Sequence, residues 1–158
     1  MKNKDEQESA REYAFLLLKY RLRSVEELRD RLKNKKFSET AIKNTIDFLK
    51  EKRFLDDAQF SRAWISSRLK RPYGLRRIKQ ELRLKGVDKE IVERQAGDLS
   101  CDYSEPDIVE EIVTRKADNL KGLEPVKARQ RLYSYLIRRG FTPEIVIEKI
   151  NRLWKQAY

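Results

Sequence analysis

The chain has 158 residues, and 37 lysines and arginines against 26 aspartates and glutamates leave a formal net charge of +11. Charged residues make up 40% of the sequence, and only five glycines and four prolines occur, too few for a β-rich fold with many turns. The excess of cations predicts affinity for a polyanion, such as nucleic acid, an acidic protein surface or an anionic membrane. A merely soluble cationic protein would have the same composition.

Residue types that commonly carry catalysis or bind metals are scarce. The chain has no histidine, which removes the most frequent general base and the most frequent zinc ligand. Cys101 is the only cysteine, so it can form neither an internal disulfide nor, alone, a structural zinc site. The glycines are isolated rather than gathered in a phosphate-binding loop. We therefore expect no enzymatic activity, no metal and no cofactor.

The apolar run nearest the start of the chain covers only residues 14–18, which is far too short to span a bilayer. The first dozen residues mix lysines with acids and lack the layout of a signal peptide. Together with the single cysteine, these features predict a cytoplasmic protein with no membrane partner.

Three helices are expected at the start of the chain, near residues 6–22, 25–35 and 39–52. Ser24, followed three residues later by Glu27, is typical of a capping box, and Ser38 is a good N-cap by residue type. Lys36 occupies the turn that should end the second of these helices.

The next three helices are expected near residues 57–70, 74–85 and 89–99. Asp56 with Gln59 resembles a capping box in a carboxylate version, Asp57 falls in the first helical turn, and Asp88 is a good N-cap. The adjacent Asp56 and Asp57 could instead bind a metal, but we favour the capping role because the helix dipole stabilises negative charge there. Gly86 suits a left-handed cap at the end of a helix.

The last three helices are expected near residues 105–120, 125–139 and 143–156. Ser104 is a good N-cap by type, and Thr142 followed by Pro143 places proline at the first helical position. Gly140, like Gly86, sits where a helix should end in a left-handed residue.

An apolar template recurs three times along the chain, at offsets of 50 and then 54 residues. Its positions are Leu28, Leu32, Phe37, Ile42, Ile46 and Leu49, then Ile78, Leu82, Val87, Val92, Ala96 and Leu99, then Leu132, Leu136, Phe141, Val146, Ile150 and Leu153. The helix that opens each copy adds a stripe, namely Ala14, Leu17 and Leu18, then Phe60, Ala63 and Trp64, then Ile108, Ile112 and Val113.

The template predicts an all-α fold of three tandem three-helix, helix-turn-helix-like repeats, covering residues 1–52, 53–99 and 100–158. Because one such unit buries little apolar surface, we expect neighbours to stack and complete a shared core. A single long coiled coil is the alternative, but its heptads would break at every turn signal.

Cations are concentrated in the central repeat. Residues 68–85 contain eight of them against the single acid Glu81, and the eight are Arg68, Lys70, Arg71, Arg76, Arg77, Lys79, Arg83 and Lys85. With Leu75, Ile78 and Leu82 buried, the helical period places Arg76, Lys79 and Arg83 along one flank, where they could follow a phosphate backbone or an acidic groove. A merely solvated helix face is the alternative. Arg77 is expected to pair with Glu81, four residues on.

Aromatic and acidic residues add two further expectations. Four aromatic residues should lie in the core, namely Phe37, Phe60, Trp64 and Phe141. Tyr73 lies in the basic turn between the helices expected at 57–70 and 74–85, where it could stack on a base or on a partner side chain. Six acids without a cation lie between residues 98 and 111. We expect this segment to lie away from any DNA or to contact a basic surface of a protein partner or a neighbouring repeat, and a flexible acidic linker is the alternative.

Three segments resemble motifs of the RecX family. These are L-D-D-A-Q-F at residues 55–60, with Arg68 and then Y-G-L-R-R-I-K-Q-E-L-R-L-K-G-V at 73–87; R-R-G-F at 138–141; and S-V-E-E-L-R-D-R-L from residue 24. The resemblance covers almost the whole chain in order. One departure is Lys36, where the family often has glycine, which puts the first turn's cap in doubt.

The resemblance implies that the three repeats form an elongated, curved arrangement. It also implies a non-catalytic, monomeric regulator, mainly an inhibitor, of the RecA recombinase. Such a protein would bind the RecA–DNA filament and modulate its ATPase and strand exchange in recombinational DNA repair and the SOS response, with weak, salt-sensitive DNA binding. From charge placement we expect the contacts to recombinase or DNA to be Arg68, Lys70, Arg71, Tyr73, Arg76, Lys79 and Arg83.

The alternative is a helix-turn-helix-like protein that acts directly on DNA. The third helix of each repeat would then read the base edges. In the central repeat that helix carries four acids and two bases, from Asp88 to Asp98, which suits a position between phosphates poorly.

Overall fold

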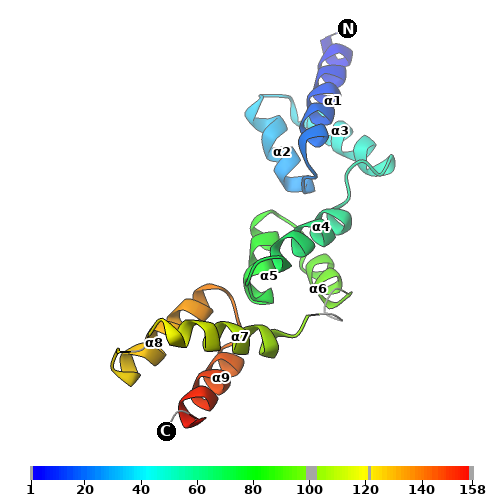
Figure 1. Ribbon diagram of the computed structural model, residues 1–158. Helices are drawn as coiled ribbons and strands as arrows, with labels where there is room; N and C mark the ends of the chain where they lie inside the picture. Colours follow the sequence, from blue (N-terminus) through cyan, green and yellow to red (C-terminus); the bar gives the residue numbers. More distant parts are fainter. Residues whose placement is uncertain (1, 99–102, 121, 157–158) are drawn as a thin grey trace. The chain divides into compact units, whose positions relative to one another are not determined.

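The computed structural model describes residues 2–98, 103–120 and 122–156, and within these ranges the regular structure is entirely helical (Figure 1). The elements are α1 (Lys2–Tyr20), α2 (Val25–Asn34), α3 (Glu39–Glu51), α4 (Asp57–Leu69), α5 (Leu75–Leu84), α6 (Lys89–Asp98), α7 (Glu105–Asp118), α8 (Pro125–Arg138) and α9 (Pro143–Gln156). The expected all-α class and order of helices are confirmed. The largest difference is at α1, which begins at Lys2 rather than near residue 6. In the described part of the chain, no helix has the length and apolarity needed to cross a membrane.

The chain forms two compact units, Met1–Trp64 with Glu81–Gln95 and Ile65–Gln80 with Ala96–Tyr158. The first unit has a core in which α1, α2 and α3 pack around Leu28, Leu32 and Ile46. The second has a core in which α7, α8 and α9 pack around Ile112, Leu136 and Phe141. Each fully buried side chain of this size stabilises the fold by about 1.5–3 kcal/mol relative to an exposed one, so the apolar template supplies most of the driving force.

The recurring template is confirmed by burial. Phe37 and Leu153 are half-buried, Leu99 lies outside the described residues, and every other position of the template is buried. The opening stripe was predicted less well in α4: Phe60 is buried and Trp64 half-buried, but Ala63 is exposed.

The exposure of Ala63 has a local cause. Phe60 and Trp64 share one side of α4, and the buried face of the helix extends from them away from Ala63, to the fully buried Ile65. Ser61 is buried beside it because its Oγ donates to the carbonyl oxygen of Asp57 at 2.7 Å, which satisfies the hydroxyl within the helix.

The expected N-caps are mostly confirmed. Ser24 and Glu27 form a complete capping box, and the Ser38 hydroxyl accepts from the Ala41 N–H. The Asp56 carboxylate accepts from the N–H groups of Ala58 and Gln59 at 2.7 and 3.1 Å, and the Asp88 carboxylate accepts from the Glu90 N–H at 2.8 Å. Ser104 also occupies the expected N-cap position of α7, but its side chain makes no capping hydrogen bond, and a proline follows in the first turn.

The second helix of every repeat ends in the same turn. Lys36, Gly86 and Gly140 have φ angles of 62°, 75° and 85°, and the N–H of the next residue returns to a carbonyl five residues back in each case. The left-handed caps predicted at Gly86 and Gly140 are confirmed, and the first turn adopts the same geometry with lysine.

Replacing Lys36 with glycine should raise the free energy of unfolding by about 1 kcal/mol, because an L-residue with a side chain is strained at positive φ. Denaturant titration of the full chain measures the change. Lys35→Gly is the matched control, since Lys35 has a right-handed φ of −80° and gains nothing from glycine's freedom. Equal destabilisation by both substitutions would contradict this account of the turn.

Candidate functional site

The residues predicted to contact a partner lie on the last turn of α4, on the following turn and on α5. Ile78 and Leu82 are buried and Leu75 is half-buried, as expected, so the flank of α5 carries Arg76, Lys79 and Arg83 by helical period. Arg68, Tyr73 and Lys79 are half-buried, and the exposed members of the predicted set are Lys70, Arg71, Arg76 and Arg83. Arg83 forms a partly exposed ion pair with Glu93 at 3.5 Å.

In the first compact unit, the start of α2 contacts both the end of α5 and the start of α4. The hydroxyl of Ser24, which is fully buried, donates to the carbonyl oxygen of Lys85 at 2.6 Å. The Val25 N–H donates to the Asp57 carboxylate at 2.8 Å. A Cβ at Gly86 would lie 2.4 Å from the Cβ of Glu26, which shows how closely the two segments approach.

Lys85 and Glu27 form the electrostatic centre of this contact. The Lys85 ammonium lies 2.7 Å from a Glu27 carboxylate oxygen and 4.4 Å from the centre of the Trp64 ring, and the Trp64 N–H donates to Glu81 at 3.0 Å. Burial opposes ionisation of Glu27, but its hydrogen bonds to Arg21 and Lys85 prevail and lower its pKa to about 2. Lys85 therefore forms contacts within the fold, although in the sequence it belongs to the basic segment at residues 68–85.

The second compact unit contains a corresponding contact. The Gly74 N–H donates to the carbonyl oxygen of Arg139 at 2.9 Å, and the Arg77 guanidinium donates to that of Arg138 at 3.2 Å. A Cβ at Gly74 would lie 2.1 Å from the Gly140 carbonyl oxygen, so only glycine fits. Ser24 and Gly74 are 50 residues apart, and Lys85 and Arg139 are 54 apart, so the two contacts use equivalent positions of the repeats.

Tyr73 lies under three guanidinium groups from its own unit. The Arg68, Arg77 and Arg139 guanidinium carbons are 5.9, 4.6 and 5.0 Å from the centre of its ring. The Tyr73 carbonyl oxygen also accepts from the Tyr103 hydroxyl at 3.4 Å, and burial raises the pKa of Tyr103. The ring thus orients one cation of α4, one of α5 and one of the turn after α8, a role that its position in the sequence did not suggest.

The acidic segment that precedes and begins α7 contacts cations and backbone of α9. The Glu110 carboxylate lies 2.6 Å from the buried Lys149 ammonium and 3.7 Å from the Arg152 guanidinium, and these cations lower its pKa. Glu105 accepts from the Thr142 N–H, so it serves the start of α9. Leu99, Cys101 and Asp102 lie outside the described residues.

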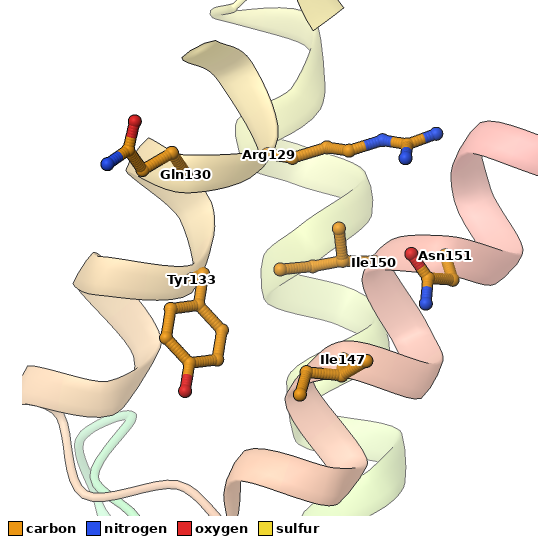
Figure 2. A pocket seen from close by; sticks show the side chains of 6 residues that line it. All are labelled: Arg129, Gln130, Tyr133, Ile147, Ile150 and Asn151. Carbon is orange, nitrogen blue, oxygen red and sulfur yellow. The ribbon is translucent and has the colours of Figure 1, made fainter. Parts of the chain in front are cut away.

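The two flanks of α8 differ in chemistry. One flank and α9 form a groove of about 230 Å³, where Tyr133 and Ile147 project between the helices and Arg129 lies at the margin (Figure 2). The Arg129 guanidinium lies 5.5 Å from the centre of the Trp154 ring. The other flank of α8 carries Arg131 and Arg138, which lie near Lys116 of α7. These cations were not predicted as a site from the sequence, although the helical spacing of Arg131 and Arg138 places both on one side of α8.

Within the described residues, no group of three or more histidines, cysteines, aspartates or glutamates lies so as to hold a metal ion. The fold and the site thus define a protein of tandem three-helix units with a cationic central segment. Models of the first, second and third three-helix domains of RecX match residues 10–49, 56–94 and 104–150.

Related proteins agree with these matches. The regulatory protein RecX of Mannheimia succiniciproducens is 34% identical over 133 residues, which cover 84% of this chain and 86% of that protein. That of Haemophilus influenzae is 32% identical over 141 residues, covering 89% and 91%. The crystal structure of RecX from Lactobacillus salivarius superposes with a TM-score of 0.80 at 21% identity, covering 94% of this chain and 97% of that one, and supports the fold. The chain belongs to the RecX family of regulatory proteins.

Proposed function

We propose that the chain is a non-catalytic regulator of the RecA recombinase, which binds the RecA–DNA filament and mainly inhibits its ATPase and strand exchange. Membership of the RecX family is the observation that carries the proposal, because these relatives are named regulatory proteins. We further propose that the protein acts as a cytoplasmic monomer and that its repeats span residues 1–52, 53–99 and 100–158.

The physical basis of the proposed regulation is differential affinity. A row of helical repeats offers several contacts to a helical filament. Its binding shifts the equilibrium between two filament states only by the difference between its affinities for the two states. A difference of 1.4 kcal/mol corresponds to about tenfold in that equilibrium. Exposed cations on one helix can supply such a difference if an acidic groove or a phosphate backbone accepts them in one state only.

The contacts proposed for this role are the predicted set around α5. Lys70, Arg71 and Arg76 are exposed, and Arg83 has a partly exposed partner in Glu93. An exposed ion pair of this kind contributes about 0.2–1 kcal/mol, so a stronger acidic partner can displace it. Arg68 and Tyr73 are proposed to hold the basic turn in shape as well as to contact the partner.

Direct sequence-specific DNA binding is the weaker candidate. The helix that would enter the groove in the central repeat is α6, and its Glu90, Glu93 and Asp98 are exposed against the cations Lys89 and Arg94. Negative side chains on that face would oppose the phosphates on both sides of the groove.

The decisive experiment measures the DNA-dependent ATPase and strand exchange of the cognate recombinase with increasing amounts of the full chain. We expect inhibition at substoichiometric amounts. Replacing Arg76, Lys79 and Arg83 together with alanine should raise the concentration needed for half inhibition about tenfold, which corresponds to 1.4 kcal/mol.

The matched control removes three exposed lysines elsewhere, Lys19, Lys43 and Lys127, and thus the same charge. If the α5 variant keeps its potency, the site is wrongly assigned. If the unaltered chain leaves both activities unchanged while it binds one duplex tightly, regulation of the recombinase is refuted.

A further inference from the structure

A basic pocket lies in the second compact unit, between the end of α7 and the cationic flank of α8. Its volume is about 230 Å³. The polar side chains that line it are Lys116, Asn119, Arg131, Tyr135 and Arg138. None of them belongs to the set of contacts predicted from the sequence.

Helical spacing explains how the pocket forms. In α8, Ala128, Leu132 and Leu136 form the buried stripe of the helix. Arg131 and Tyr135 are four residues apart and Arg138 follows three later, so all three side chains project along one edge of that stripe. Lys116 and Asn119, three residues apart at the end of α7, close the other side.

The charge of the pocket is uncompensated among its described lining residues, which include three cations and no carboxylate. The buried Lys149 of the same unit, in contrast, has a carboxylate at 2.6 Å. A cation near a helix C-terminus stabilises the helix, which accounts for Lys116 and Arg138. It does not account for Arg131 in the middle of α8, and like charges gathered in a concave recess favour a bound anion.

Aromatic rings hold cations at this site in place. The Lys116 ammonium and the Arg139 guanidinium lie 4.2 and 5.1 Å from the centre of the Tyr135 ring. Arg139 also lies 5.0 Å from the centre of the Tyr73 ring. Cations and tyrosines therefore alternate from the basic turn at Tyr73 to the pocket, and an oriented cation loses less conformational entropy when it binds an anion.

We infer that this pocket binds a phosphate of single-stranded nucleic acid, with the strand continuing towards Tyr73. Alternating cations and aromatic rings suit a single strand, whose phosphates and bases contact such residues without sequence preference. A concave recess accepts a phosphate that can turn inward, which the regular backbone of a duplex does not allow without distortion. The inference does not require the recombinase, so it stands or falls separately from the proposed function.

The test measures binding of a fluorescein-labelled oligothymidylate to the full chain by anisotropy, without recombinase, over a range of salt concentrations. A Lys116→Gln, Arg131→Gln and Arg138→Gln triple variant should bind about tenfold more weakly. Because the pocket neutralises one phosphate, its loss should also reduce the magnitude of the log–log salt slope by about 0.7. Glutamine keeps the side-chain stems, and circular dichroism verifies that each variant is folded.

The control variant replaces Arg115, Lys127 and Lys155, three exposed cations of the same unit that do not line the pocket, with glutamine. It should retain affinity within about twofold and keep most of the salt slope. A variant that keeps the three charges, with Lys116→Arg, Arg131→Lys and Arg138→Lys, should preserve the salt slope. Equal losses in the pocket and control variants would overturn the inference, as would tight polyglutamate binding with no oligonucleotide binding.

Discussion

Replacing Gly74 with alanine should lower the free energy of unfolding of the second compact unit by at least about 3 kcal/mol. The new methyl group would lie 2.1 Å from the Gly140 carbonyl oxygen and 2.5 Å from the Phe141 nitrogen, and both are backbone atoms that cannot rotate away. Overpacking against movable side chains costs about 1–3 kcal/mol, and a collision with backbone exceeds it. Urea titration followed by circular dichroism measures the change.

Gly97→Ala is the matched control. Gly97 lies within α6, and nothing lies within 4 Å of a Cβ built there, so alanine should stabilise the chain by about 0.5–1 kcal/mol. Because Gly74 and Gly140 meet in one contact, the cost of Gly74→Ala and Gly140→Ala combined should be less than the sum of the single costs. If Gly74→Ala proved as harmless as Gly97→Ala, the close approach of the two turns would be refuted.

The reason for glycine at Gly86 and Gly140 cannot be read from the sequence near these turns. Gly86 and Gly140 were predicted as helix caps, and their positive φ angles confirm it, but Lys36 adopts the same conformation without glycine. The distinguishing feature is the neighbour: a Cβ at Gly86 meets Glu26, and one at Gly140 meets Arg77, each about sixty residues away in the sequence. We infer that glycine is needed here chiefly because another repeat docks on the turn.

Local patterns predicted the fold well because helical periodicity and capping act over a few residues. The capping box at Ser24 needs only Glu27, and the buried stripe of α5 follows from its spacing. Prediction failed in α4, because Phe60 and Trp64 alone do not decide whether the buried face continues towards Ala63 or towards Ile65. Residue type placed the N-cap of α7 correctly at Ser104 but did not determine whether its side chain forms a capping bond.

The candidate site was less predictable because its chemistry depends on contacts between distant segments. Lys85 looked like another member of the basic segment, yet its ammonium is paired with Glu27 and its carbonyl with Ser24. The cationic pocket combines α8 with Lys116 of α7, and no pattern within either helix reveals that they meet. Charge counting located a basic segment but could not separate cations that serve folding from cations that remain accessible.

The contact between Lys85 and Glu27 makes a second large effect measurable. Replacing Glu27 with glutamine should lower the free energy of unfolding by about 2 kcal/mol at pH 7, because the ion pairs to Lys85 and Arg21 are lost while the side chain keeps its size. The full pKa shift would correspond to more, but water reaches part of the carboxylate and screens the interaction.

The same substitution should lose its effect in acid. The pKa of Glu27 is lowered in the fold from 4.5 to about 2, so the stabilisation is complete above pH 4.5 and disappears as the pH falls towards 2. Urea titrations of the unaltered and Glu27→Gln chains at pH 7, 4 and 2.5 should therefore converge. Glu26→Gln is the control, since Glu26 is exposed and its pairing with Arg29 at 3.4 Å contributes little. A difference between the unaltered and Glu27→Gln chains that persisted unchanged to pH 2.5 would show that glutamate acts there through packing rather than charge.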